Sequence, residues 1–166
     1  MRRPRSKVLG AAAMAAETRR LRAAGRKVVL TNGCFDLIHA GHVKYLAFAR
    51  RQGDVLVVGL NSDRSVRRNK GPGRPLTPQR DRATVVAALK SVDYVVIFNE
   101  DEPARLVARL LPDVLVKGRD WKHYVSGGET VRKRGGRVVL APLLAGRSTS
   151  ALIRKMAGRG CGSRPE

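Results

Sequence analysis

The chain has 166 residues, of which 43% are hydrophobic, so we expect one domain with a packed core and exclude global disorder. The two cysteines, Cys34 and Cys161, form no disulfide framework, which indicates a reducing compartment. No apolar run reaches the roughly 20 residues that a membrane span needs. The basic N-terminus does not resemble a secretory signal, so we expect a cytoplasmic protein without a membrane partner.

The net charge of +21 comes from 34 basic and 13 acidic residues. Such an excess suggests polyanionic partners, either nucleic acid, anionic lipid or phosphorylated small molecules, although a surface bias toward arginine would also produce it. Aromatic residues make up only 4%, which argues against the stacking platforms of a single-strand binder. Much of the charge lies near the ends. We therefore expect a basic N-terminal extension over residues 1–26, a domain over 27–156 and a tail over 157–166, with both ends solvated.

Short apolar runs alternate with longer amphipathic ones from residue 27 onward. The extension contains a possible helix at about 11–24. In chain order, the pattern then predicts strand 28–30, helix 41–51, strand 54–60, a polar Gly/Pro-rich loop over 67–78, a helix from 77 or 78 to 88, strand 94–98, helix 102–111, strand 114–116, helix 129–134, strand 138–140 and helix 151–156.

Continuously apolar strands separated by helices indicate a parallel sheet covered on both faces. We therefore predict an α/β fold, a single-domain doubly wound parallel sheet of about five strands, which is Rossmann-like. Ligands bind such sheets beyond the carboxyl ends of the strands. The informative segments are those that follow strands, at residues 31–42, 61–63, 117–121 and 141–150.

Two histidines, His39 and His42, stand three residues apart at the start of the helix that follows the first strand. This spacing places both on one helix end, beside free backbone N–H groups that attract anions. Gly41 leaves room for a phosphate to approach the backbone. Neither a P-loop nor a Gly-x-Gly-x-x-Gly fingerprint accompanies them. The pattern favours transfer chemistry on a nucleoside triphosphate, in which positioned donors stabilise developing charge. Metal ligation, with His123 or Cys34 added, and unrelated surface histidines are the alternatives.

The segment from Thr31 to His42 resembles the signature of the His-x-Gly-His nucleotidyltransferases. Over about 27–154 the chain resembles, more closely, the adenylyltransferase domain that makes ADP-heptose from heptose 1-phosphate and ATP. Stretches at 58–63, 70–75, 92–98, 112–118 and 147–153 carry this closer likeness. The kinase domain often fused to this activity is not in the sequence, so a stand-alone enzyme is expected.

The resemblance implies roles for individual residues. It makes His39, His42 and Lys70 catalytic, with Lys70 on a mobile loop. Nucleotide binding is implied for Asn32, Gly33, Cys34, Phe35, Gly41, Lys117, Gly118, Asp120, Arg147, Ser148, Thr149 and Ser150. Substrate binding is implied for Asp36, Asn61, Asp63, Arg82 and Trp121. The plainer alternatives are a solvated Lys70, a surface Arg82, a packing role for Trp121 and ordinary helix caps at 148–150.

Two stretches bear on which nucleotide is used. Arg119 and Trp121 stand where the adenylyltransferase branch has Gly and Tyr, and this form resembles the glycerol-3-phosphate cytidylyltransferases. Pro142 is followed by Leu143-Leu144, whereas the cytidylyltransferases carry an Arg-Thr pair there, which favours the adenylyl branch. Ser150 replaces the usual Thr.

The resulting prediction is an enzyme that transfers AMP from ATP to a sugar 1-phosphate, with release of pyrophosphate. Mg²⁺ would be held by the substrate phosphates and not by protein ligands. Cys34 is not expected to be catalytic. The alternatives are cytidylyl transfer to glycerol 3-phosphate or a similar polyol phosphate, and a basic nucleic-acid-binding module. The enzyme prediction includes no nucleic-acid partner, and the resemblance implies a homodimer.

Overall fold

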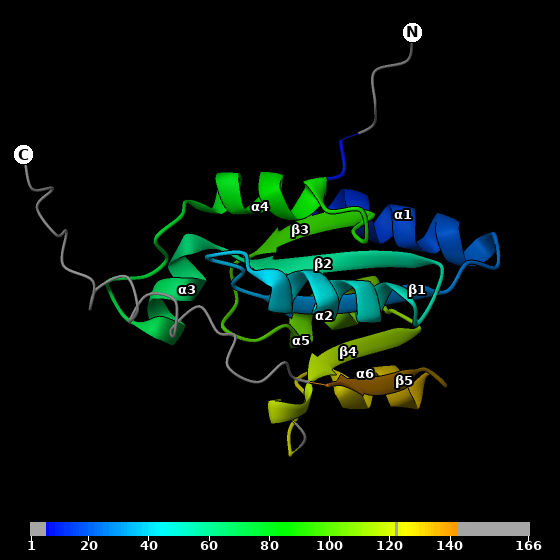
Figure 1. Ribbon diagram of the computed structural model, residues 1–166. Helices are drawn as coiled ribbons and strands as arrows, with labels where there is room; N and C mark the ends of the chain where they lie inside the picture. The colour runs from blue at the N-terminus through cyan, green and yellow to red at the C-terminus, as the bar shows by residue number, and fades with distance from the viewer. Residues whose placement is uncertain (1–5, 122, 143–166) are drawn as a thin grey trace, which may run out of the picture.

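Five parallel strands form one sheet in the computed structural model, which describes residues 6–121 and 123–142. The strand order is β3-β2-β1-β4-β5. The strands are β1 (Val28–Gly33), β2 (Val55–Asn61), β3 (Tyr94–Phe98), β4 (Val114–Gly118) and β5 (Arg137–Ala141). Because the chain places β2 and β4 on opposite sides of β1, the winding direction reverses between β1 and β4 (Figure 1). The predicted doubly wound parallel sheet is confirmed.

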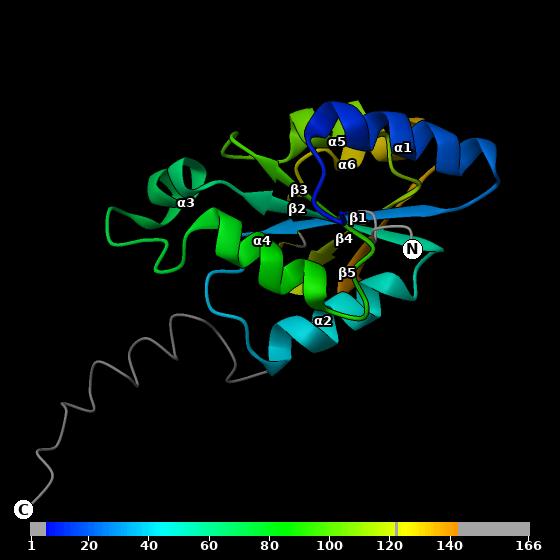
Figure 2. The ribbon, with the colours of Figure 1, turned by 90° about the horizontal axis from the view of Figure 1, so that it is seen from above.

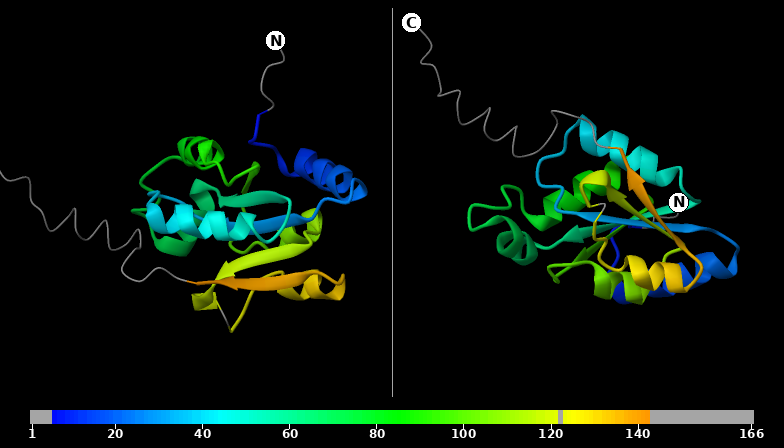
Figure 3. Two further views of the ribbon diagram at one scale, coloured as in Figure 1. Left: turned by 45° about the vertical axis from the view of Figure 1, so that its right-hand side comes forward. Right: turned by 90° about the horizontal axis from the view of Figure 1, so that it is seen from below.

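Helices cover both faces of the sheet, as Figure 2 shows. On one face lie α1 (Ala11–Ala23), α5 (Ala104–Leu110) and α6 (Gly128–Lys133), and on the other lie α2 (Ala40–Arg50) and α4 (Gln79–Ala88). A short helix, α3 (Asp63–Lys70), and a 3-10 turn, η1 (Arg119–Trp121), follow the carboxyl ends of β2 and β4. The two further views in Figure 3 show the same three layers. This double cover explains why every residue of β2 is buried.

Three aspartates tie the amino ends of adjacent strands together. The carboxylates of Asp54, Asp93 and Asp113 accept hydrogen bonds from the backbone N–H groups of Lys27, Leu56 and Val28, respectively, each at 2.8 Å. Each of these bonds joins residues far apart in the sequence. They therefore hold the strands in register at the edge of the sheet opposite the carboxyl ends.

Helix α1 packs on the sheet, so the expectation of a wholly solvated N-terminal extension is wrong for these residues. Met14, Ala15 and Leu21 are buried in the same apolar cluster as the strand residues. The hydroxyl of Tyr94 in β3 donates to Glu17 at 2.8 Å. The buried face of α1 also includes Ala15 and the polar Thr18, which weaken its amphipathic pattern, so the sequence did not indicate this packing.

Helix α3 occupies the start of a segment that was expected to be a loop. Ser62 caps it by accepting a hydrogen bond from the backbone N–H of Ser65. The hydroxyl of Ser65 donates to the carbonyl of Glu100, which ties α3 to the end of β3. Lys70 therefore lies in the last turn of a helix and not on a free loop. The predicted helix 151–156 and the tail 157–166 lie outside the described residues.

Candidate active site

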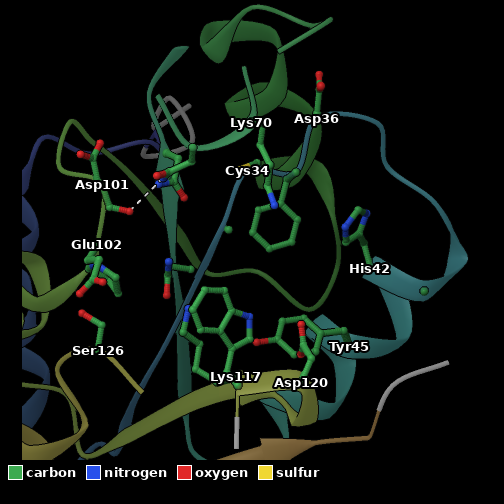
Figure 4. Close-up of a pocket in the computed structure, with 18 of the residues that line it drawn as sticks. Cys34, Asp36, His42, Tyr45, Lys70, Asp101, Glu102, Lys117, Asp120 and Ser126 are labelled. Carbon is green, nitrogen blue, oxygen red and sulfur yellow. Dashed lines mark hydrogen bonds between the residues drawn. The ribbon is translucent and has the colours of Figure 1, made fainter. Parts of the chain in front are cut away.

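A pocket of about 600 Å³ opens at the carboxyl edge of the sheet, beside the reversal between β1 and β4. Figure 4 shows side chains from several separate segments converging on it. The predicted site residues that line it are Asn32, Gly33, Cys34, Phe35, Asp36, His39, Gly41, His42, Asn61, Lys70, Lys117, Asp120 and Trp121. Three other predicted residues do not line the pocket: Asp63, Arg82 and Gly118. Residues Arg147, Ser148, Thr149 and Ser150 lie outside the described residues.

The two histidines stack against each other at the start of α2. Their ring centroids are 3.9 Å apart with an interplanar angle of 23°. His39 is the extended N-cap residue and His42 lies in the first turn, so the pair flanks the first amides of the helix. Burial, followed by the neighbouring His39, lowers the pKa of His42 to about 4, so its ring is neutral at pH 7. The arrangement offers polarisable imidazole donors beside backbone N–H groups, which suits an anionic ligand.

The chain between β1 and α2 bends sharply so that an aromatic ring can support His42. Phe35 has a φ of 46°, a conformation that a bulky residue rarely adopts, and it is almost fully buried. Its ring lies 5.2 Å from the ring of His42, centroid to centroid. A Cβ at residue 33 would lie 3.0 Å from Phe35 Cε2, so Gly33 permits this close approach. This loop therefore fixes the position of the imidazole pair.

Cations border the pocket from two further elements. Lys70 reaches it from the end of α3, and Lys117 reaches it from β4 (Figure 4). Burial lowers the pKa of Lys117 to about 8, against the attraction of Asp120, Cys34 and Glu102. Lys117 Nζ also lies 4.8 Å from the ring centroid of Trp121, an exposed side chain at the rim of the pocket. These two cations can attract phosphate groups, and the lining also includes carboxylates.

Asp36 holds a segment of chain over the pocket. Its buried carboxylate accepts hydrogen bonds from Arg74 Nε at 2.6 Å and from the backbone N–H groups of Leu76 and Thr77. Burial acts to raise the pKa of Asp36, but the bonds from Thr77, Leu76 and Arg74 outweigh it and lower the pKa. Asp36 is therefore ionised and positions residues 74–77, at the far side of the pocket from β4.

Arg82 is fully buried. The sequence predicted a substrate contact, with a surface position as the alternative, and neither prediction included this burial. Its guanidinium donates to the carbonyls of Cys34, Asn61 and Thr77 and to Asp63 Oδ1 at 2.7 Å. Those acceptors belong to the segments that follow β1, β2 and α3. Arg82 therefore joins three segments beneath the pocket.

Several lining residues were missed by the sequence analysis. They are Tyr45, Asn69, Arg74, Asp101, Glu102, Pro103, Ser126 and Pro142. Asn32 Oδ1 and Ser126 Oγ are buried and find no hydrogen-bond partner among the described residues. Unsatisfied buried polar atoms that face a pocket are available to a ligand. Ser126 and Glu102 carry no local sequence signal, because they reach the pocket only through the packing of α5 and α6.

The described residues include no group of three or more His, Cys, Asp or Glu side chains that could hold a metal ion. Asp36 is engaged by Arg74, and Asp101 forms an ion pair with Arg68. Burial raises the pKa of the Cys34 thiol, which leaves it a weak nucleophile and a weak ligand. Among the helices of the described part of the chain, none has the length and apolar character needed to cross a membrane.

Comparisons with known proteins agree with this geometry. The family described as cytidylyltransferase-like matches residues 30–145. The bifunctional protein HldE of Magnetococcus marinus is 54% identical over 141 residues, which cover 84% of this chain and 29% of that protein. The protein of the same name from Mesorhizobium japonicum is 59% identical over 133 residues, 80% of this chain and 27% of that protein. The chain thus spans less than a third of the length of these relatives.

Two solved structures have similar folds. The lipopolysaccharide core biosynthesis protein of Thermoplasma volcanium is 29% identical, with a TM-score of 0.59, over 72% of this chain and 98% of that one. Pantoate-beta-alanine ligase of Francisella tularensis, solved with beta-gamma ATP and beta-alanine, has a TM-score of 0.60 at 14% identity, over 86% of this chain and 68% of that one. The second likeness shows the fold alone.

Proposed function

Because the chain belongs to the cytidylyltransferase-like family, we propose that it transfers AMP from ATP to a sugar 1-phosphate, with heptose 1-phosphate as the preferred acceptor. An oxygen of the sugar phosphate attacks the α-phosphorus of ATP. The bond from that phosphorus to the β-phosphate oxygen breaks, and pyrophosphate leaves. The observation that carries the proposal is the stacked pair His39 and His42 at the start of α2, lining the pocket beside the reversal of the sheet.

The chemistry asks the protein for positioning and charge stabilisation, because phosphoryl-type transfer needs little covalent help. The imidazoles of His39 and His42 donate to the triphosphate as charge builds on its oxygens. Lys70 and Lys117 attract the phosphates from opposite sides, and the amides of the first turn of α2 add backbone donors. Cys34 takes no part in the chemistry, in keeping with its raised pKa.

Mg²⁺ belongs to the same proposal as an ion held by the triphosphate oxygens. This fits the described residues, whose carboxylates near the pocket are engaged by arginines or lie singly. When bound, the ion neutralises triphosphate charge and assists departure of pyrophosphate.

We further assign the ribose and the acceptor to residues at the rim of the pocket. Asp120 would accept hydrogen bonds from the ribose hydroxyls, and Trp121 would pack against the bound substrates. Asn61, at the end of β2, would contact the acceptor. We assign Arg147 to Ser150 to the β- and γ-phosphates. Asp36, Asp63 and Arg82 act by holding the loops that surround the substrates. A cytoplasmic homodimer with its catalytic domain over 27–156 completes the proposal, and light scattering measures the oligomeric state.

Pyrophosphate release measured on a substrate panel tests the proposal. ATP with heptose 1-phosphate should outrun CTP with glycerol 3-phosphate by at least tenfold in kcat/KM. Leaving out the sugar phosphate gives the background hydrolysis of ATP. Faster turnover with CTP and glycerol 3-phosphate would replace adenylyl transfer with cytidylyl transfer. No turnover with any pair, together with salt-dependent binding of random duplex DNA, would favour the nucleic-acid-binding alternative.

A further inference from the structure

A second cavity lies at the opposite edge of the sheet from the catalytic pocket. It has a volume of about 620 Å³ and forms where α1 ends and β1 begins, at the right-hand end of the molecule in Figure 1. Its charged lining consists of Arg19, Arg22, Arg26, Lys27, Arg134 and Asp113. We call this cavity the basic groove. Five cations and one carboxylate therefore share a single concave surface that the proposed reaction does not use.

The single carboxylate in the basic groove is already engaged. Asp113 Oδ2 accepts from the backbone N–H of Val28 at 2.8 Å, and its other oxygen lies 4.0 Å from Arg22 Nε. Arg22 also donates to the carbonyl of Leu111, and Arg26 donates to the carbonyl of Asp54. These contacts fix two guanidinium groups in place without neutralising them fully.

The remaining cations of the groove have no such partners. Among the described residues, the side chains of Arg19, Lys27 and Arg134 form no hydrogen bond or ion pair. Basic residues in the last turn of a helix interact favourably with its dipole, which accounts for Arg22. The same effect applies to Arg134, the C-cap residue of α6, but it does not account for Arg26 or Lys27, which lie between α1 and β1. Cations from separate segments thus converge where their mutual repulsion is only partly compensated.

We propose that the basic groove binds a small anion that carries two or more phosphate groups. Guanidinium groups present paired donors that match phosphate oxygens, and most of the groove cations are arginines. The volume lies in the range of small-molecule sites. The lining holds no aromatic side chain, so the described groove offers no aromatic platform for a nucleobase. The groove gives a role to α1 and to part of the +21 charge, neither of which the catalytic proposal uses.

Nuclear magnetic resonance with inorganic tripolyphosphate as the probe tests this site separately from the catalytic one. Amide signals of residues 23–27 report on the groove, and those of 33 and 41 report on the catalytic pocket. Arg19→Gln/Arg134→Gln removes two groove cations whose side chains form no hydrogen bond or ion pair in the described structure. Arg51→Gln/Lys90→Gln removes the same charge from exposed positions that do not line the groove.

We expect saturable shifts at 23–27 in the wild-type chain. The groove variant should bind tripolyphosphate roughly tenfold more weakly, and the control variant should change affinity by less than about threefold. Three results would overturn the proposal: unshifted groove amides, equal weakening in both variants, or groove shifts caused by short duplex DNA at lower concentrations than by tripolyphosphate. Groove binding in a chain that lacks transferase activity would contradict only the proposed reaction.

Discussion

Replacing Arg82 with methionine separates a supporting role from a substrate contact. The side chain of Arg82 has no exposed surface, and its guanidinium serves three carbonyls and the carboxylate of Asp63. Methionine fills similar space but donates nothing. Breaking a fully buried ion pair by removing one partner costs about 3–5 kcal/mol, and less here because Asp63 is partly exposed, while each buried acceptor left without a donor costs about 1–3 kcal/mol. We therefore expect Arg82→Met to lower the free energy of unfolding by about 3–5 kcal/mol, a large share of a typical domain's stability.

Urea unfolding followed by circular dichroism measures this loss. Arg80→Met is the matched control, because Arg80 lies on the exposed side of the same helix, and its replacement should change stability by less than about 0.5 kcal/mol. The outcome that refutes the reasoning is a loss below about 1 kcal/mol accompanied by a large rise in KM for the sugar phosphate. Arg82 would then contact substrate directly, as the family resemblance implied.

Four further predictions concern the pocket itself. His42→Ala should lower kcat by about 10²–10³-fold with little loss of stability at pH 7, because the imidazole acts on developing charge; near-normal turnover would remove the proposed role. The free energy of unfolding of the wild-type chain should fall as the pH drops from 6.5 to 4. The reason is that His42 takes up a proton at higher pH in the unfolded chain than in the folded chain, where its pKa is about 4. Urea titrations across that range should show a smaller fall for His42→Ala. Cys34→Ser should keep most of its turnover in the pyrophosphate assay, and loss of all activity in a folded variant would contradict the mechanism. Nucleotide affinity should weaken as the pH rises through about 8, where Lys117 loses its proton. In calorimetric titrations Lys117→Arg should abolish this pH dependence. A wild-type affinity that stays constant up to pH 9.5 would contradict a contact between Lys117 and phosphate.

The fold was predictable because its strongest signals are local. Short apolar runs such as 55–60 and 94–98 are typical of buried strands, and the helical patterns between them indicate a doubly wound sheet. Helix α3 was missed because its sequence is nearly all polar, and only Ser65 and Val66 are buried. Its position depends on Ser65 contacting Glu100 and on Arg68 pairing with Asp101, and both contacts reach across the chain.

The site was partly predictable for the same reason. The segment from Asn32 to His42 carries its chemistry in consecutive residues, so its motif was visible in the sequence. Ser126 and Glu102 enter the pocket through the packing of separate helices, and no local pattern marks them. Arg82 has an ordinary position in an amphipathic helix, and only the three-dimensional structure reveals its carbonyl partners.

Helix α2 begins at Ala40, and His39, its N-cap residue, provides no side-chain cap. The first backbone N–H groups of a helix have no partner within the helix, and at the pocket an incoming anion would accept hydrogen bonds from them. Occupancy would then finish a structural element, so the liganded enzyme would resist heat and proteases better than the empty one. Part of the binding energy for the anion would also come from backbone N–H groups, which do not depend on the side chain. Substitutions in this turn would change the environment of the imidazoles but leave the backbone contribution intact. The site would therefore tolerate sequence changes in this turn.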